Sequence, residues 1–528
     1  MSHSFIPDSA PFNEEQRAWL NGFFSGLMGI QPGGDPQAVA AAIGVAVPGA
    51  EVPAGEEEED EDFPWHDSAL PIVDRMELAE GKPLKRKLMA AMAQLDCGSC
   101  GYICQTYSEA IASGEESNLT LCSPGGKETK QMLKALVAES GGTSEAAKPA
   151  ATNGSVGWSR SNPYSAKLVE SRGLNLEGSA KDTRHVVIDL SGSGLKYEVG
   201  DALGIYPSNC GDLAAMVVDR LAADATVKVT TPLGNDKPLL SALCEDCCLK
   251  DPTDELLELL ASRISDAEAK TTFATMLDEG VPDGFDVLDA LECAEGATVT
   301  ATEVVELLEP LNPRLYSIAS SMKHVGDQVH LTVGKVVYER EGRVRKGAAS
   351  TMLADRVDPG GTLRVFVQPN HGGFTVPADP AKPMIMVGPG TGIAPFVAFL
   401  QERDAANCPG KNWLFFGDQH EAFDFLYEAE LKGYAESGLL TRLDTAFSRD
   451  GDQKVYVQDR MREQGAELWR WLEEGAHFFV CGDASRMASD VDRALKQIIA
   501  DHGKLSSEDA AAYVQQMTKD KRYVRDVY

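Results

Sequence analysis

Hydrophobic patterning predicts a strand, a glycine turn and a helix near the middle of the C-terminal half. Met384–Val387 is continuously apolar, as in a buried strand, and Ile393–Leu400 resumes with apolar residues at helical spacing. The turn between them, Gly388–Gly392, holds three glycines and a proline. Glycines let a backbone approach a ligand closely, and the free N–H groups of a helix start favour a pyrophosphate. The unit suits a dinucleotide, although such a turn also occurs where a chain merely reverses.

A different pattern precedes this unit. Asp182–Leu190, Pro313–Ser321 and Val329–Tyr338 are short, alternating segments that predict a small antiparallel barrel. Between about 210 and 310 the periodicity becomes helical, for example over Asp254–Ile264. A helical insertion is therefore expected to interrupt the barrel.

The first part of the chain predicts little regular structure. Asn13–Gly29 has the pattern of an amphipathic helix, expected to pack on the protein's own core rather than on a partner. Gln31–Asp62 is rich in Pro, Gly and Ala and ends in the acidic run Glu56–Asp62, which predicts a solvated tether that could also contact a basic partner. Gly141–Ser155 is a second, small-residue linker.

Charge and composition exclude several classes of partner. The 528 residues carry a formal net charge of -32, which disfavours nucleic acid and anionic membranes and could steer a basic protein. No apolar stretch reaches the roughly 20 residues that span a bilayer, and the N-terminus lacks a signal pattern, so a cytoplasmic location is expected. Eleven cysteines are too sparse for a disulfide scaffold.

Four of those cysteines cluster between Asp96 and Gly126. A C-x2-C pair with a nearby third and a remote fourth cysteine can ligate a [4Fe–4S] cluster, and small residues around the pair leave room for one. A structural zinc is the alternative, but its cysteines usually form two close pairs. The expected ligands are Cys97, Cys100, Cys104 and Cys122. A second group, Cys244, Cys247 and Cys248, has no fourth ligand close by and is interpreted as structural.

This cysteine segment resembles the small iron–sulfur domain of ion-pumping ferredoxin:NAD reductases and corrinoid iron–sulfur proteins. The shared features are Cys97-Gly-x-Cys100-Gly, a helix containing Tyr107-Ser-Glu-Ala-Ile, and Cys122-x-Pro-Gly-Gly. The family usually has four residues between its second and third cysteines, whereas this chain has three. This shorter spacing affects the third expected ligand, Cys104, whose match to the family is therefore less close than that of the other three cysteines.

From about Asn162 to Tyr528 the chain resembles the ferredoxin-NADP reductase superfamily, and within it the flavoprotein subunits of assimilatory NADPH-sulfite reductases. The motifs that carry the likeness are NPYSAKL, GDALGIYP, PRLYSIASS, GAASTMLADRV, GPGTGIAPF, GKNWLFFG, SRDGDQKVYVQDRMREQGAELWRW, VCGDASRMASDV and the terminal RYVRDVY. The resemblance implies an NADPH-dependent oxidoreductase that binds FAD.

The resemblance also assigns cofactor-binding residues. Those implied for FAD are Arg314, Leu315, Tyr316, Ser317, Thr332, Val333, Gly334, Tyr338, Gly347, Ala348, Ala349 and Ser350. Those implied for the nicotinamide dinucleotide lie in Gly388–Pro395, including Gly388, Gly390, Thr391 and Gly392. Those implied for the adenosine 2′-phosphate and a further NADP contact are Ser448, Arg449, Lys454, Tyr456, Gln458 and Asp490. An arginine and a lysine beside hydroxyl groups suit a phosphate dianion, which favours NADPH over NADH, although a solvated basic patch is the alternative.

Four residues match positions beside the reacting rings. The resemblance implies that Ser317 bonds near the flavin N5, Cys481 positions the nicotinamide carbon and Asp526 stabilises transient positive charge. Without its sequence context, Cys481 would be interpreted as a buried cysteine at a strand end. The last residue, Tyr528, matches an aromatic that covers the flavin face and must move before nicotinamide can stack.

One departure from the sulfite reductase flavoproteins concerns the electron carrier. Residues 1–155 lack the alternating strands and helices and the phosphate loop of a flavodoxin-like domain, so FMN is not expected. A [4Fe–4S] cluster carries one electron at a time and could replace it. The expected path runs from NADPH through FAD and the cluster to a sirohaem sulfite reductase subunit, with linkers letting the cluster domain swing. The alternatives are a general reductase for nitrite reductase, ferredoxin or a haem protein, and a flavin reductase with a zinc-bound docking module.

The expected fold is multidomain α+β and α/β. An antiparallel β-barrel FAD domain with a helical insertion precedes a Rossmann-like parallel α/β NADP domain, and a small helical iron–sulfur domain lies N-terminal to both. The expected boundaries are 1–45 for an N-terminal helical segment, 46–79 for an acidic linker, 80–140 for the iron–sulfur domain, 141–158 for a linker, 159–378 for the barrel with its insertion at about 210–310, and 379–528 for the NADP domain.

Overall fold

A computed structural model describes residues 63–66, 70–94, 102–116, 118–140, 157–370, 372–484 and 486–528. The chain divides into two compact units, Met1–Asp62 and Phe63–Tyr528. The predicted helix over 13–29, the tether before Phe63, the linker at Gly141–Ser155, and two expected ligands, Cys97 and Cys100, lie outside the described residues.

A six-stranded antiparallel sheet forms the middle of the second unit. Its strand order is β6-β3-β10-β1-β2-β7. Just beyond β6, Ile318 pairs with Leu331 of β7, so the two outermost strands meet and the sheet closes into a barrel. The bounds are β1 Tyr164–Gly173, β2 Thr183–Asp189, β3 Ala202–Tyr206, β6 Arg314–Ser317, β7 Gln328–Gly334 and β10 Thr362–Gln368. The antiparallel sheet predicted from alternation is confirmed.

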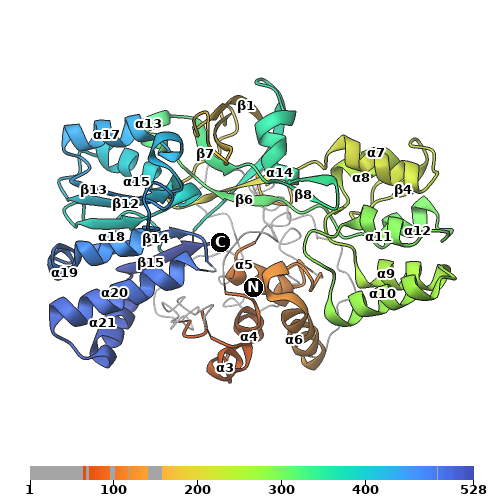
Figure 1. Ribbon diagram of the computed structural model, residues 1–528, viewed down its shortest axis with the longest axis horizontal. Coiled ribbons are helices and arrows are strands. Elements are labelled where there is room, and N and C mark those ends of the chain that lie inside the picture. The colour runs from red at the N-terminus through yellow and green to blue at the C-terminus, as the bar shows by residue number, and fades with distance from the viewer. Residues whose placement is uncertain are drawn as a thin grey trace, which may run out of the picture. The chain divides into compact units, whose positions relative to one another are not determined.

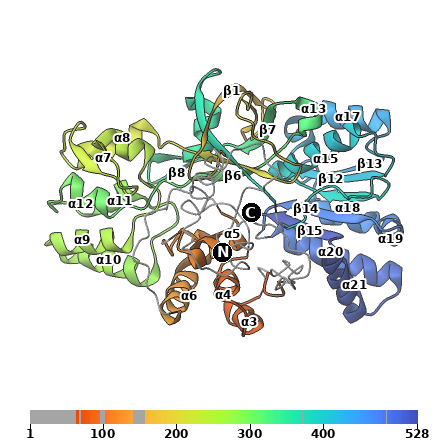
Figure 2. The ribbon, with the colours of Figure 1, turned by 180° about the vertical axis from the view of Figure 1, so that it is seen from behind.

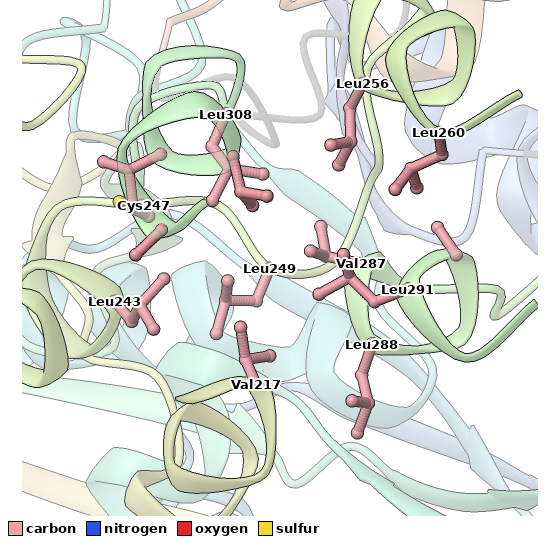
Figure 3. Close-up of a cluster of buried hydrophobic side chains, with 14 of the residues drawn as sticks. Val217, Leu243, Cys247, Leu249, Leu256, Leu260, Val287, Leu288, Leu291 and Leu308 are labelled. Carbon is pink, nitrogen blue, oxygen red and sulfur yellow. The ribbon is translucent and has the colours of Figure 1, made fainter. Parts of the chain in front are cut away.

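The insertion between β3 and β6 has a core of its own (Figure 3). Its helices are α7 Gly211–Arg220, α8 Leu239–Glu245, α9 Asp254–Arg263, α10 Ala267–Glu279, α11 Val287–Cys293 and α12 Ala301–Glu306. Thr253, Asp266 and Thr300 cap three of them by accepting a backbone N–H. The insertion is not wholly helical, because β4 Lys228–Thr230 and β5 Asp236–Pro238 form a hairpin. Leucine and valine side chains from α7, α8, α9 and α11 meet in Figure 3 with Leu249, Leu308 and the buried Cys247 from the connecting segments.

A second hairpin joins the barrel to this insertion. It consists of β8 Val337–Arg340 and β9 Arg343–Lys346, and α13 Met322–Val325, α14 Ala348–Thr351 and the π-helical turn η2 Met352–Arg356 complete the domain. Arg345, which is buried, donates to both carboxylate oxygens of Asp289 on α11 at 2.9 and 2.8 Å. Both bonds come from Nη2 of Arg345, and Arg343 of the same hairpin also donates to Asp289, at 2.5 Å, so two arginines hold the hairpin to the insertion.

The C-terminal domain is built on a parallel sheet with helices on both faces (Figure 1). The strand order is β13-β12-β11-β14-β15, so the sheet grows outward in both directions from β11. The strands are β11 Met384–Val387, β12 Asn412–Asp418, β13 Arg442–Phe447, β14 His477–Gly482 and β15 Tyr523–Val527. In such sheets ligands bind beyond the carboxyl ends of the strands where the order reverses, which is the end of β11.

Alternate residues of β11 face different cores. Ile385 and Val387 pack with the helices α18 to α21, whereas Met384 and Met386 pack with α15 and its neighbours. The whole strand is buried, which explains its continuously apolar pattern. The remaining bounds are η3 Gly390–Ile393, α15 Ala394–Ala405, α16 Glu421–Asp424, α17 Glu428–Ser437, α18 Val457–Glu463, α19 Gly465–Glu473, α20 Met487–Gly503 and α21 Ser507–Lys519.

Helices also form the described part of the N-terminal region, seen from behind in Figure 2. They are α3 Ile72–Leu78, α4 Leu84–Ala91, α5 Cys104–Ser113, η1 Ser123–Gly125 and α6 Gly126–Glu139. The expected acidic linker over 46–79 differs from the structure at its C-terminal end. There α3 is helical, and its Ile72 joins the core of α4, α5 and α6, because the sequence turns amphipathic after Pro71. In the part of the chain that the structure describes, no helix is long and apolar enough to cross a membrane.

Candidate active site

Three predicted residues from distant parts of the chain meet at one point. Ser317 ends β6 of the barrel, while Cys481 and Asp526 pair directly across the neighbouring strands β14 and β15. Ser317 Oγ donates to Asp526 Oδ2 at 2.8 Å, and Cys481 Sγ lies 3.7 Å from the same oxygen. One carboxylate therefore links the barrel to the parallel sheet.

The Cys481 side chain is a protonated donor in this arrangement. It is fully buried, and burial raises the pKa of its thiol well above the usual range, with the Asp526 charge acting in the same direction. A thiol that does not ionise can hydrogen-bond to the carboxylate without adding a second negative charge. Cys481 thus suits a positioning role rather than a nucleophilic one.

A cavity of about 330 Å³ opens beside these residues. Its walls come from the barrel, from the C-terminal domain and from the N-terminal helices. Tyr528 lies at its edge, 41% exposed, and its hydroxyl is 2.9 Å from Thr391 Oγ1 in the glycine turn. Its lining includes Leu315, Tyr316, Ser317, Thr332, Gly334, Thr391, Asp526 and Tyr528, together with Phe63, His66, Met89, Ile103 and Gln105 from the N-terminal region.

The cavity suits a flat, partly apolar ring system. Tyr316 supplies an aromatic wall, and burial raises the pKa of its phenol, so it is neutral there. Ser317 and Asp526 place polar atoms on one side. A flavin ring has this combination of apolar faces and a polar edge.

A larger groove, of about 1220 Å³, continues from Tyr528 along the ends of β11, β12 and β14. The predicted residues Gly390, Thr391, Ser448, Tyr456, Gln458 and Asp490 line it. Arg449 and Lys454 do not line it, and both side chains are exposed on the loop that joins Ser448 to Tyr456. The structure therefore places the hydroxyls expected around a 2′-phosphate in the groove and the two cations beside it.

Two glycines of the turn are required by packing. A Cβ at Gly392 would lie 2.1 Å from the Cys481 carbonyl oxygen, and one at Gly388 would lie 2.5 Å from the Phe396 ring. Any side chain there would separate the turn from β14 or from α15. Gly390 differs, because its φ is +57° and its Cβ position faces the groove.

Several residues expected to contact FAD line neither hollow. Val333 is fully buried in the barrel core, so only its backbone is available to a cofactor. Tyr338 is 43% exposed on the β8–β9 hairpin, and Arg314 donates to the carbonyl of Asn312 at 2.9 Å. Ser350 Oγ accepts the Val336 N–H at 3.1 Å and so helps to shape the turn at Gly347, Ala348 and Ala349.

The structure also brings in residues that the sequence patterns did not single out. Lys181, Asp418 and Arg486 line the groove, and five N-terminal residues line the cavity. Lys181 lies in an irregular segment and Asp418 at a strand end, where no periodicity marks a functional side chain. Position at the carboxyl end of β12 was the one signal available for Asp418.

Of the four expected cluster ligands, Cys104 and Cys122 are described. Cys104 begins α5 and Cys122 precedes η1, and both pack against the same small core of α4, α5 and α6. Ile103 and Gln105, which flank Cys104, line the cavity that also holds Ser317 and Asp526. No group of three or more metal-binding side chains occurs among the described residues, which exclude Cys97 and Cys100.

Fold and site define a flavin-dependent nicotinamide oxidoreductase. Residues 157–352 match the model of the FAD binding domain, and residues 386–493 match that of the oxidoreductase NAD-binding domain. The chain belongs to the family of the NADPH-sulfite reductase flavoprotein alpha-components, which confirms the resemblance inferred from sequence.

Three relatives illustrate how far this similarity extends. The alpha-component of Bacillus subtilis (strain 168) is 42% identical over 463 residues, which are 84% of this chain and 76% of the relative. Those of Mannheimia succiniciproducens and Neisseria meningitidis serogroup A are each 46% identical over 71% and 70% of this chain. The matches cover 62% and 61% of those two relatives, so the chain spans under two thirds of their length.

Proposed function

We propose that this protein takes electrons from NADPH through FAD to an iron–sulfur cluster and delivers them to a sirohaem sulfite reductase subunit. Electron transfer from NADPH to FAD is supported by one observation above all: Ser317, Cys481 and Asp526 meet at the mouth of a cavity and beside the glycine turn. The relatives are named NADPH-sulfite reductase flavoproteins, which supports the donor and the final substrate.

The proposed roles of the chain's own residues follow from this geometry. FAD, when bound, supplies hydride acceptance and release of single electrons. Asp526 holds the Ser317 hydroxyl at 2.8 Å and so orients it toward the cavity edge. Tyr528, bonded to Thr391, covers this edge and would have to swing away before nicotinamide could reach the cavity.

For the dinucleotide, the groove supplies both a phosphate turn and a specificity pocket. Gly390 and Thr391 lie where the diphosphate would cross β11, and Ser448, Tyr456 and Gln458 lie farther along the same groove. Arg449 and Lys454 flank that far end and can turn inward on a 2′-phosphate dianion. NADPH rather than NADH is therefore the proposed donor.

The iron–sulfur step is supported by the position of Cys104. Its two neighbours in sequence, Ile103 and Gln105, line the same cavity as Ser317 and Asp526. A cluster held by Cys97, Cys100, Cys104 and Cys122 would then lie close to the flavin site. A one-electron carrier at that place would take over the task that FMN performs in flavodoxin-like domains.

Metal and flavin analysis of anaerobically purified protein tests the whole scheme. We expect FAD without FMN, plus iron and sulfide whose visible absorbance bleaches after the flavin during NADPH titration. Zinc in place of iron would instead support a docking module on a flavin reductase. FAD that NADPH does not reduce would contradict the donor.

The acceptor requires a separate test. The word alpha-component in the relatives' names implies at least one further component. We expect Cys122→Ser to abolish sulfide formation with a sirohaem partner while NADPH–ferricyanide activity remains. Loss of both activities together would contradict a cluster that lies downstream of the flavin.

A further inference from the structure

An ion pair crosses the nucleotide groove from one domain to the other. Lys181 lies in the segment between β1 and β2 of the barrel, and its Nζ contacts the carboxylate of Asp418 at the end of β12. Asp418 also accepts the Gln419 N–H at 2.7 Å through the same oxygen, Oδ1. Both residues line the groove.

The position of the Asp418 carboxylate is energetically unfavourable. Its side chain is 1% exposed, and its second oxygen, Oδ2, is buried without a hydrogen-bond partner. Burial raises the pKa of this carboxyl, while Lys181 opposes that shift. A buried carboxylate with one unsatisfied oxygen lowers the stability of the fold. This cost suggests that the Lys181–Asp418 pair has a role in ligand binding at the groove rather than in folding.

One local bond and two bonds between the domains hold the segment that carries Lys181. The Lys181 N–H donates to Ser179 Oγ at 2.9 Å, and Ser179 in turn donates to the buried Asp424. Asn175 Nδ2 donates to the same carboxylate at 2.8 Å. The segment that carries Lys181 is therefore anchored to the domain that carries the glycine turn.

The ion pair lies directly over Gly390. A Cβ added at Gly390 would lie 3.9 Å from Lys181 Nζ and 3.8 Å from Asp418 Oδ2. Among the described residues, the other cations that line the groove are Lys335 and Arg486. Lys335 is bound to Asp182 and Asp355 at 3.2 and 2.8 Å, and Arg486 comes from the segment before α20.

We infer that Lys181 binds the diphosphate of the dinucleotide and that Asp418 holds its ammonium group over the glycine turn. This assignment rests on the proposed function and adds a binding residue contributed by the barrel domain. An ammonium group has three donors, so Lys181 can keep its bond to Asp418 while it donates to a phosphate oxygen. A diphosphate at Gly390 would otherwise meet the Asp418 carboxylate without a cation between them.

Lys181→Gln tests the assignment through binding rather than turnover. The dissociation constants of NADP⁺ and of adenosine 2′-monophosphate are measured by calorimetry on the full chain loaded with FAD. We expect the variant to weaken NADP⁺ binding by about ten- to a hundredfold, as for loss of a charge-assisted hydrogen bond. Adenosine 2′-monophosphate lacks the diphosphate, so its affinity should change less than about twofold.

Two matched variants complete the experiment. Lys181→Arg keeps the charge and should recover most of the NADP⁺ affinity, whereas Lys196→Gln removes an exposed lysine from the same domain and should change neither ligand. Equal weakening of both ligands by Lys181→Gln, or no weakening of either, would overturn the assignment. Failure of the unmodified protein to bind either ligand would instead overturn the proposed use of NADPH.

Discussion

Ser317 donates a hydrogen bond of 2.8 Å to Asp526, although 209 positions separate the two residues in the chain. The bond joins the first strand after the insertion to the last strand of the protein. It depends on both domains being folded and in contact, so it reports on the assembled site rather than on either domain alone. Hydride transfer between two bound rings needs this kind of fixed geometry.

Asp526→Asn should slow reduction of bound FAD by NADPH by about ten- to a hundredfold. The amide keeps the size of the carboxylate but loses its charge, and hydrogen bonds to charged groups are worth roughly 1.5 to 3 kcal/mol. Stopped-flow absorbance at saturating NADPH measures the rate. Ser317→Ala should give a similar loss, and the double variant should be little slower than either single one.

An unchanged rate in Asp526→Asn at normal FAD content would show that the carboxylate serves packing only. Full additivity of the two changes would show that the Ser317–Asp526 bond is not the unit that acts.

Tyr528→Ala should weaken the preference for NADPH over NADH by about tenfold. Tyr528 covers the cavity edge and bonds to Thr391 at 2.9 Å, so a nicotinamide ring must displace it. We expect binding energy from the 2′-phosphate to drive that displacement, which only NADPH can supply. The ratio of the two kcat/KM values in steady-state kinetics measures the preference.

Tyr528→Phe is the control for this prediction, because it keeps the ring and loses only the bond to Thr391. It should retain most of the preference. If Tyr528→Ala leaves the ratio of kcat/KM values unchanged, the ring is not a barrier to nicotinamide.

Much of the fold could be predicted from sequence. The apolar run of β11 follows from burial on both faces of that strand. Alternation located β2 and β7, although both strands also bury consecutive residues in their middle, such as Val186 and Val187 in β2. The short strands β4 and β5 could not be predicted, because three residues carry no period. The helix α3 was missed because it follows an acidic, proline-rich stretch whose composition dominated the prediction.

The site was predictable only where a motif marks it. Ser317, Cys481 and Asp526 stand in strong motifs, and the structure brings them within one hydrogen-bonded group. Lys181 and Asp418 stand in no motif, and only the meeting of the two domains relates them. Val333 shows the opposite case, because its motif suggested a cofactor contact while its side chain fills the barrel core.

Buried histidines make the barrel sensitive to acid. Burial lowers the pKa of His185 to about 3 and that of His330 to about 4, with the nearby Arg172 acting in the same direction. Both values lie below the unfolded value of about 6.5, so the unfolded chain binds more protons as the pH falls. Stability should be constant above about pH 6.5 and fall toward pH 4, by about 1 kcal/mol per pH unit for each histidine.

Thermal unfolding between pH 7 and pH 4.5 measures this slope. His185→Gln should make it shallower, since Gln does not titrate and can still bond to the Tyr427 hydroxyl that His185 contacts at 3.0 Å. His502→Gln changes an exposed histidine of the C-terminal domain and should leave the slope as it is. Equal slopes in all three proteins would refute the prediction.

Arg345→Met should destabilise the barrel domain by about 1.5 to 3 kcal/mol. The change removes the charge-assisted hydrogen bonds from the buried Arg345 to Asp289, which are worth roughly this much, while Arg343 still contacts the same carboxylate at 2.5 Å. The neighbouring Arg340→Met is the matched control, because its nearest Asp289 oxygen is 3.5 Å away. Urea unfolding followed by fluorescence should separate the two variants, and similar losses would contradict the prediction.

The N-terminal helices should loosen when their contacts to the barrel domain and its insertion are removed. The Arg160 guanidinium lies 3.6 Å from the ring centre of Tyr102, and Thr120 Oγ1 donates to Glu309 at 2.9 Å. Each contact of this type is worth about 1 kcal/mol. Arg160→Ala combined with Glu309→Gln should therefore speed hydrogen exchange in α5 by roughly tenfold or more.

The same double variant separates docking from the integrity of the active site. Because α5 begins at Cys104 and the residues on either side of Cys104 line the cavity, loosening it should slow electron transfer from flavin to the proposed cluster while NADPH still reduces the flavin at its normal rate. Lys130→Gln removes a pair with the half-exposed Asp254 and should change neither rate. If exchange in α5 rises but transfer to the cluster keeps its rate, the docked position does not serve electron transfer, and a swinging domain would explain the chain better.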